Sequence, residues 1–436
     1  MRRLMLASRR SWVVSSVREM KDSGIPWIGD IPIDWKVGKV KGCLRRHEVK
    51  GHGDATVLAL YRDHGVVPKD SRDDNHNRTG KDTNDYKFVR EGDLVINKMK
   101  AWQGSLSVSY HEGIVSPAYF IYEFIGRDLE RSYADYLLRS TYKQEFERVS
   151  GGIREGQWDL PRYEFEHMQL LLPSFDEQRR IAAYLDERCS AIAEVRRTLN
   201  DEIEALQRLR KATIYRAVTK GLDEGVPMRD SGIEWIGKIP ETWKMVPNYA
   251  VFSEFREIVG SRADQYTLLS LTKQGVIERD LDGGGKFPSS FDTYQVVRPG
   301  QMIFCLFDID ETPRTVGLSS KHGMITGAYD VFNVDESVCD SRYVLYYYLT
   351  VDEDKHLRPY YRSLRKTLTS TMFKHVKMPL PPLSEQKRIA NYLDCRCAAI
   401  DSVIDTRTKQ LDRIEDYRRA LIFAYVTGKK EVPSHE

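Results

Sequence analysis

The sequence predicts an α+β fold. We expect two globular domains, each a twisted sheet with helices, separated by two long antiparallel coiled-coil helices and related by an internal pseudo-twofold repeat. The first observation is that a block starting at Met20 returns at Met228, and one starting at Pro173 returns at Pro381, both 208 residues later. The second is heptad spacing of apolar residues after each later block. The third is the alternation of short β-branched runs and helical stretches between the blocks.

Residues 1–19 lie outside this repeat. They contain five arginines and one glutamate, a charge of +4, so the rest of the chain carries −1 of the total of +3. We expect an N-terminal extension that is disordered or lies upstream of a natural start at Met20. Its apolar stretch, residues 12–14, is too short for a signal peptide. A basic binding surface must therefore be a local patch, because net charge does not predict one.

The first domain is expected over residues 20–172 and the second over residues 223–380. Each opens with a Trp/Gly/Pro block, in which Trp27 and Trp35 are interpreted as core anchors. Residues 89–96 and their copy, 297–304, read as a turn entering a buried strand. Residues 113–121 match residues 323–331 at a spacing of 210, so the second insert is locally longer by two residues. A helix is expected over residues 133–150.

Spacer helices are expected over residues 173–222 and, with a short tail, 381–436. Ser174 and Glu177 have the spacing of a capping box. Neither helix contains Pro or Gly over about 40 residues, which corresponds to a length of roughly 60 Å. The expected apolar seam consists of Ile181, Leu185, Ile192, Val195, Leu199, Ile203, Leu206 and Leu209, and of Ile389, Leu393, Ile400, Val403, Leu411, Ile414 and Leu421. The two helices are the obvious partners for each other, although each could instead pair with an outside protein.

Composition indicates an ordinary soluble protein, with 41% hydrophobic and 30% charged residues. No apolar run has the roughly 18 residues of a membrane span, so no membrane association is expected. The six cysteines show neither a disulfide framework nor zinc spacing, which favours a cytoplasmic location. Cys189 and Cys397 are repeat partners and are interpreted as small buried apolar residues.

Motifs for catalysis are missing. The sequence has no phosphate-binding loop, dinucleotide-binding glycine motif or zinc-protease motif. The glycines at 283–285 read as a flexible loop. Residues 116–119 loosely resemble an adenine-methyltransferase motif but lack the amide or carboxylate that would bind the target amine. Asp308 and Asp310 could bind a metal, but no nuclease pattern accompanies them. We therefore expect no enzyme activity, no metal and no cofactor in this chain.

Loops that could recognise nucleic acid are the remaining candidates for a functional site. After a predicted strand, Asn97, Lys98, Lys100, Trp102 and Gln103 combine groups that hold phosphates and pair with base edges. The alternative is a polar surface loop with Trp102 packed inward. Arg154 and Arg162 mark a second candidate segment.

Corresponding candidates occur in the second domain. Lys273 and Gln274 belong to a loop whose counterpart is residues 62–65. The other expected DNA-binding residues are Thr312, Arg314, Arg362, Arg365, Lys366 and Thr369. Basic side chains on loops are often only solvated, so the clusters carry more weight than their members.

A family resemblance rests on three sets of residues. Residues 22–29 and 230–237 resemble the opening of the target recognition domains of type I restriction–modification specificity subunits. The helix entries resemble those of the same family, in Leu172, Pro173, Glu177, Gln178, Arg180 and Ile181 and in Leu380, Pro381, Glu385, Gln386, Arg388 and Ile389. Residues 417–422 and 426–428 are similar to the family's helix ending, from which residues 209–214 and 218–221 depart. The resemblance covers residues 20 to about 430.

The resemblance implies a non-catalytic subunit that reads a split, asymmetric target in double-stranded DNA. Each domain would recognise one half-site, and the helices would fix the unread gap. Two modification (methyltransferase) subunits would dock on the helices and methylate adenine, and restriction subunits would translocate and cleave DNA. S-adenosylmethionine, ATP and Mg²⁺ are expected in those partners. The alternatives are a stand-alone DNA-binding regulator, a coiled-coil scaffold without a DNA role and an autonomous methyltransferase.

Overall fold

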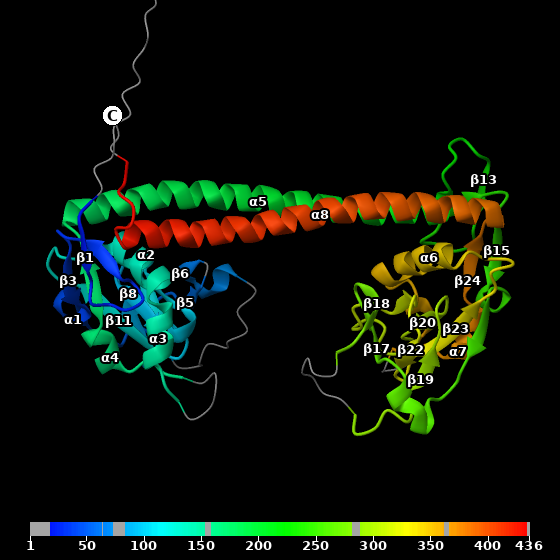
Figure 1. The fold of residues 1–436 in the computed structure, drawn as a ribbon, viewed down its shortest axis with the longest axis horizontal. Helices are drawn as coiled ribbons and strands as arrows, with labels where there is room; N and C mark the ends of the chain where they lie inside the picture. Colours follow the sequence, from blue (N-terminus) through cyan, green and yellow to red (C-terminus); the bar gives the residue numbers. More distant parts are fainter. Residues whose placement is uncertain are drawn as a thin grey trace, which may run out of the picture. The chain divides into compact units, whose positions relative to one another are not determined.

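The computed structural model describes residues 18–62, 64–72, 83–152, 158–280, 288–361 and 366–433. The chain divides into two compact units, shown in Figure 1. Unit 1 comprises Met1–Thr198 and Gln410–Glu436, and unit 2 comprises Leu199–Lys409. Each of the two long helices contributes one end to each unit.

The opening block of unit 1 forms a hairpin against the core. β1 (Met20–Asp22) pairs with β2 (Asp30–Pro32), and β3 (Lys36–Lys39) pairs with β12 (Gln169–Leu172), both antiparallel. The Trp35 side chain is 1% exposed in the main core, and Trp27 packs against that core from its edge. The two tryptophans are therefore the core anchors that the sequence predicts.

An antiparallel four-stranded sheet, in the order β4-β11-β8-β9, is the centre of unit 1. The remaining strands form two antiparallel pairs, and four short α-helices among the described residues contribute side chains to the core. The elements are α1 (Val40–Cys43), β4 (Leu44–Arg46), β5 (Leu58–Tyr61), β6 (Gly65–Pro68), η1 (Lys69–Ser71), β7 (Lys87–Val89), β8 (Leu94–Asn97), η2 (Ala101–Gln103), β9 (Leu106–Val108), β10 (Gly113–Val115), β11 (Tyr119–Phe124), α2 (Arg131–Thr141), α3 (Lys143–Val149) and α4 (Arg162–His167). The helix expected over residues 133–150 is two helices, because Tyr142 breaks the helical backbone between α2 and α3.

Unit 2 repeats this plan, with a sheet in the order β16-β23-β20-β21. The expected strand equivalences hold, since β20 follows the turn that matches the turn before β8. The elements are β13 (Met228–Asp230), β14 (Lys238–Pro240), β15 (Lys244–Pro247), η3 (Asn248–Ala250), β16 (Phe252–Phe255), η4 (Gly260–Gln265), β17 (Leu269–Thr272), β18 (Gly275–Glu278), β19 (Gln295–Val297), β20 (Met302–Phe304), β21 (Val316–Leu318), β22 (Gly323–Ile325), β23 (Asp330–Val334), α6 (Ser341–Glu353), η5 (Arg358–Tyr360), α7 (Ser370–His375) and β24 (Lys377–Leu380).

The long helices are α5 (Phe175–Lys220) and α8 (Leu383–Val426), of 46 and 44 residues. In unit 1 the start of α5 lies beside the end of α8 (Figure 1), with the Tyr184 and Tyr425 rings 4.7 Å apart. Further along α5 and further back along α8, Arg196 Nη1 is 3.2 Å from Glu415 Oε2. In unit 2, Arg210 Nε is 2.8 Å from Asp401 Oδ1. The helices therefore run antiparallel, as predicted.

The predicted seam is wrong at three positions. The side chains of Val195, Leu209 and Val403 are 48%, 46% and 42% exposed. Their neighbours Arg196 and Arg210 face the other helix instead, where each pairs with a carboxylate. The long aliphatic part of an arginine covers apolar surface while its guanidinium finds a partner, so a basic residue occupies a seam position there.

The domain core is tied to each long helix by an equivalent pair of side chains. The indole N–H of Trp35 donates to Glu177 and that of Trp243 donates to Glu385, both at 3.1 Å. The capping box predicted for Ser174 and Glu177 is half formed. The backbone N–H of Glu177 donates to Ser174 Oγ at 3.3 Å, but the Glu177 carboxylate binds Trp35 rather than turning back. Cys397 is buried as expected, whereas Cys189 is only half-buried.

Candidate nucleic-acid interface

The first candidate loop, residues 97–105, connects β8 to β9 and is defined here as loop 1. Its two ends are joined by the hydrogen bond from Asn97 N to Ser105 O, of 3.0 Å. Asn97 Oδ1 accepts from Met99 N at 3.2 Å, and the chain turns back through Gly104, whose φ of 84° favours glycine. The Asn97 side chain therefore shapes the loop as well as being a candidate for base contact.

Loop 1 rests on the segment that precedes α4. Lys98 Nζ lies 2.9 Å from Asp159 Oδ2, and the rings of Trp102 and Trp158 are 5.1 Å apart. Trp102 Nε1 donates to Met99 O at 3.1 Å, and the side chain is half-buried. The inward packing of Trp102, given as the alternative from sequence, is thus partly realised. No pattern in the sequence indicates Asp159 as the partner of Lys98.

The remaining predicted residues of unit 1 differ in their surroundings. Lys100 is exposed, and Gln103 Oε1 accepts from Arg62 Nη2 at 3.4 Å. Arg162, 54% exposed, begins α4 and pairs with Glu166 at 2.6 Å, which raises the pKa of its guanidinium. Arg154 lies outside the described residues. The structure therefore brings Arg62, Lys98, Lys100 and Gln103 to one loop and its immediate neighbours.

The equivalent of loop 1 in unit 2, residues 305–315, connects β20 to β21 and is defined as loop 2. Cys305 N donates to Thr315 O at 2.8 Å and closes the loop base. The starts of the two loops are 208 residues apart and the ends 210, so the two-residue difference between the inserts lies within this loop. The same strand framework therefore carries two loops of different length and sequence.

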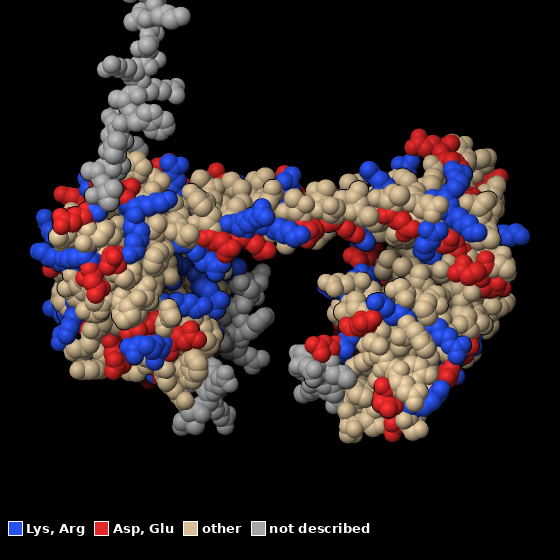
Figure 2. Space-filling model, in the orientation of Figure 1, with Lys and Arg blue, Asp and Glu red and all other residues tan. Residues whose placement is uncertain are grey.

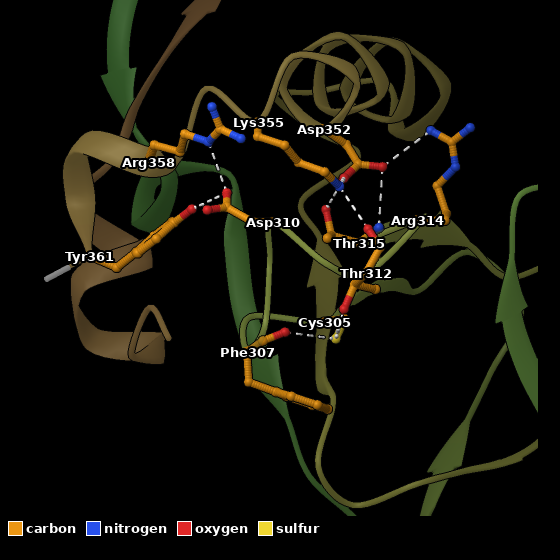
Figure 3. A network of polar contacts seen from close by, with 10 residues as sticks. All are labelled: Cys305, Phe307, Asp310, Thr312, Arg314, Thr315, Asp352, Lys355, Arg358 and Tyr361. Carbon is orange, nitrogen blue, oxygen red and sulfur yellow. Dashed lines mark hydrogen bonds and ion pairs between the residues drawn. The ribbon is translucent and has the colours of Figure 1, made fainter. Parts of the chain in front are cut away.

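Loop 2 is held by a buried carboxylate. Asp352, whose side chain is 2% exposed, accepts from Thr315 Oγ1 at 2.5 Å and pairs with Lys355 at 2.7 Å (Figure 3). Arg314 Nη1 is 3.3 Å from the same carboxylate, and its side chain is only 16% exposed. Arg314 is thus committed to an internal pair, which favours a structural role over the predicted DNA contact. The carbonyl of Thr312 accepts from Lys355 Nζ at 2.8 Å.

A second carboxylate in loop 2 gathers the cations of the neighbouring segment. Asp310 accepts from Tyr361 Oη at 2.5 Å and from Arg358 Nε at 2.9 Å (Figure 3). Lys366 Nζ lies 3.5 Å from Asp310 and 3.2 Å from Glu311. The hydroxyl of Tyr361 and the guanidinium of Arg358 lower the pKa of Asp310 to about 2. The sequence-based prediction missed Arg358, which lies just before Arg362, the first residue of the predicted basic stretch.

The other predicted residues of unit 2 lie in different surroundings. Lys273 and Gln274 are exposed in the turn between β17 and β18. Thr369 is the N-cap of α7 and accepts from Met372 N at 3.3 Å, so its hydroxyl already has a structural partner. Arg362 and Arg365 lie outside the described residues.

The segment that resembles a methyltransferase motif has a structural role. Residues 116–119 form a turn, closed by Tyr119 N donating to Ser116 O at 3.1 Å. The buried Lys87 donates to Tyr119 O at 2.8 Å, and Gln295 makes the equivalent bond to Tyr329 O in unit 2. No group of three His, Cys, Asp or Glu side chains in the described part of the chain could hold a metal ion. No helix among the described residues is long and apolar enough to span a membrane.

Charge is distributed rather than concentrated. Figure 2 shows Lys and Arg intermixed with Asp and Glu on the visible face of each unit. This agrees with the charge of −1 that remains once residues 1–19 are set aside. The basic residues that are candidates for nucleic-acid contact therefore lie on individual loops, Lys98 and Lys100 on loop 1 and Arg358 and Lys366 beside loop 2.

Comparisons with known proteins agree with this architecture. Residues 328–415 match the family described as type I restriction modification DNA specificity domain. The chain is 25% identical to the type I restriction enzyme MjaVIII specificity subunit of Methanocaldococcus jannaschii, over 92% of this chain and 94% of that protein. It is 24% identical to a second protein of that organism, provisionally named the MjaX specificity subunit, over 93% of this chain and 96% of the relative.

A solved structure described as the structural basis underlying complex assembly and conformational transition of the type I R-M system has the same fold. Its TM-score is 0.65 at 14% identity, covering 92% of this chain and 99% of that one. The repeated fold therefore defines a class of two-domain proteins built on paired long helices. Within that class, the chain is similar to the specificity subunits of type I restriction–modification systems, in agreement with the resemblance found in the sequence.

Proposed function

We propose that this chain reads a two-part, asymmetric sequence in double-stranded DNA, one half with each unit, and directs adenine methylation or cleavage by partner subunits. The observation that carries the proposal is that one strand framework presents two different loops. Loop 1 and loop 2 leave equivalent strands, yet they differ in length and in the residues that they display. Two copies of one loop would instead predict a palindromic target.

The chemistry of the loops supports DNA recognition. Lysine and arginine side chains bind phosphates, and asparagine and glutamine pair with adenine edges in the major groove. Loop 1 offers the exposed Lys100 and the half-buried Asn97 and Gln103, and the segment that faces loop 2 offers Arg358 and Lys366. These residues are the DNA-contact candidates that we rank first. Arg314 ranks lower because its side chain is only 16% exposed, and Thr369 ranks lower because its hydroxyl caps α7.

The chain is the non-catalytic recognition subunit of such a complex. Two modification subunits supply S-adenosylmethionine chemistry, and restriction subunits supply the ATP- and Mg²⁺-dependent steps. A methyltransferase must extract its target base from the helix, so the DNA is distorted in the assembled complex. The long helices, α5 and α8, offer exposed side chains to which these partners bind.

The test is methylation sequencing of a methylation-free host that expresses this chain with its cognate modification subunit. A single two-part adenine-methylated motif that disappears without this chain is the expected result. A host without this chain but with the modification subunit is the control. A stable complex that yields no motif would overturn the proposal. Sequence-specific binding by the chain alone, with no methylation, would instead indicate a stand-alone regulator.

A further inference from the structure

A carboxylate on the helix beside loop 1 binds the strand that leaves the loop. Asp135 on α2 accepts from Ser107 Oγ and from Val108 N, both at 2.8 Å. Its second oxygen pairs with Arg139 at 3.0 Å, and the carboxylate side chain is 18% exposed. Arg139 also donates to the carbonyl of Arg62, in the turn that neighbours Gln103. One carboxylate thus fixes both the exit of loop 1 and its neighbouring turn.

A carboxylate in unit 2 makes the same kind of contact with the exit of loop 2. Asp352 on α6 accepts from Thr315 Oγ1 at 2.5 Å and from Thr315 N at 3.2 Å, at the exit of loop 2 (Figure 3). Lys355 bridges this carboxylate to the carbonyl of Thr312, within the loop itself. In both units, therefore, the carboxylate accepts one hydroxyl and one backbone N–H from the exit of the loop, and a nearby cation extends the contact.

The two carboxylates are not repeat equivalents. Asp135 is the fifth residue of α2, whereas Asp352 is the twelfth residue of α6. Counted from the helix caps Glu130 and Asp340, the residue equivalent to Asp135 is Leu345, and the residue equivalent to Asp352 is Tyr142. Descent from a common repeat does not explain the shared contact, because the carboxylate lies in the middle of α2 but near the end of α6. A structural requirement that the two different loops share explains the contact instead.

The requirement follows from the position of the exit strands. Among the described residues, β9 and β21 are the end strands of their four-stranded sheets, and each pairs with one strand of its sheet. The entry strands, β8 and β20, are paired on both sides and are fixed by the sheet. The base of each loop is closed by a backbone hydrogen bond, from Asn97 N to Ser105 O and from Cys305 N to Thr315 O. The carboxylate adds a second constraint at the exit.

We propose that Asp135 and Asp352 are specificity-positioning residues: each presets the conformation of its recognition loop for one half-site. The inference rests on the proposed function. Neither carboxylate contacts DNA in this scheme. Each acts by preorganisation, because a loop that is fixed before binding discriminates between base pairs better than one that adapts to them.

The test uses the full chain with its modification subunit and a DNA library in which each half-site is varied separately. Asp352→Asn is expected to reduce discrimination against mismatches about tenfold in one half-site, the scale of one well-placed base contact. Asp135→Asn is expected to do so in the other half-site. The half-site read by the unchanged unit is an internal control in each case. Asp354→Asn and Glu147→Gln, which alter exposed carboxyls nearby, are the matched surface controls.

Thermal unfolding is measured for every variant, since a purely structural role lowers stability without changing discrimination. Unchanged discrimination in both half-sites, or an equal loss in both, would overturn the inference. If Asp352→Asn fails to fold, Thr315→Val and Ser107→Ala remove single donors to the carboxylates and test the same prediction. A wild-type complex that methylates no two-part motif would count against the proposed function itself, which separates the two failures.

Discussion

Asp330 in β23 carries a carboxyl whose environment disfavours its charged form. Burial, with a smaller contribution from Glu254, raises its pKa to about 6 against the opposing effect of Arg256 and Lys374. Because the pKa of the Asp330 carboxyl is raised in the folded state, the stability that this group contributes is fully present below about pH 3.8. It is lost as the pH rises through about 6. Asp330→Asn should therefore stabilise the protein at pH 8, by about 1–2 kcal/mol after solvent screening, and change little at pH 4.

The measurement is the thermal unfolding midpoint of wild type and Asp330→Asn at pH 4, 6 and 8. Asp335 offers a control of opposite sign, because hydrogen bonds from Ser337 lower the pKa of its carboxyl. The stability that the Asp335 carboxylate contributes is present above about pH 3.8 and is lost at lower pH. A wild type that equals the variant at pH 8 would contradict the burial argument.

Asp310 also affects the charge that unit 2 presents to DNA. Its carboxylate holds Arg358 and Lys366, and its pKa of about 2 keeps it ionised above pH 4. Asp310→Asn should strengthen non-specific DNA binding at low salt and steepen the plot of log affinity against log salt by about one. Arg358→Ala should make that plot shallower. The measurement is a salt titration of fluorescent duplex binding, and equal slopes for the three proteins would contradict the prediction.

Pairing within the fold explains which site residues could be anticipated. Arg314 and Arg358 have the same side chain, and the sequence favoured Arg314. In the structure Arg314 is 16% exposed against Asp352, whereas Arg358 is 62% exposed. The partner of Arg314 lies 38 residues away on another element, a distance along the chain at which no local pattern reports a contact.

At the level of elements, Gln386 joins the start of α8 to the domain core. The buried side chain accepts from Asp340 N at 2.9 Å and donates to Pro381 O at 2.8 Å and Val338 O at 3.1 Å. Gln386→Ala leaves three backbone groups without these partners, at a cost on the order of 3 kcal/mol. Denaturant unfolding measures this loss. Lys387→Ala, an exposed neighbour, is the control, and equal midpoints for both variants would refute the argument.

The helices show how far periodicity predicts an element. The lengths and antiparallel pairing of α5 and α8 follow from uninterrupted heptads. The position of the seam was predicted wrongly at Val195 and Val403, because these residues were assigned to it on their apolar character alone. Arg196 takes the seam position by pairing with Glu415, and an ion pair across helices depends on the partner's register. That register is fixed only when both helices have folded.

For the whole molecule, the repeat predicted more than composition did. It located two domains and two helices with equivalent joints, and the paired bonds from Trp35 to Glu177 and from Trp243 to Glu385 are its structural counterpart. What the repeat could not predict is where the copies differ. Loop 1 and loop 2 differ in sequence, in length and in the position of the carboxylate that holds them, Asp135 on α2 and Asp352 on α6.

The same repeat relates the apolar side chains that the long helices leave exposed. In unit 1 these include Val195 and Tyr417, 48% and 59% exposed, and in unit 2 Val403 and Leu209, 42% and 46% exposed. Val403 follows Val195 by 208 residues, and Tyr417 follows Leu209 by 208. Exposed apolar positions that recur through the repeat favour two equivalent docking sites, which matches the two modification subunits that we propose.

Changing one pair should therefore remove one partner. Val195→Ser with Tyr417→Ser is expected to reduce the complex from two bound modification subunits to one, and adding Leu209→Ser and Val403→Ser should abolish binding. The unfolding midpoint of the chain alone should stay nearly constant, since exposed side chains contribute little to the folded state. Glu204→Gln with Asp412→Asn changes exposed repeat partners and is the control. Native mass spectrometry gives the stoichiometry. A pair variant that still binds two subunits would place docking elsewhere on the molecule, because the repeat offers no third copy of these positions.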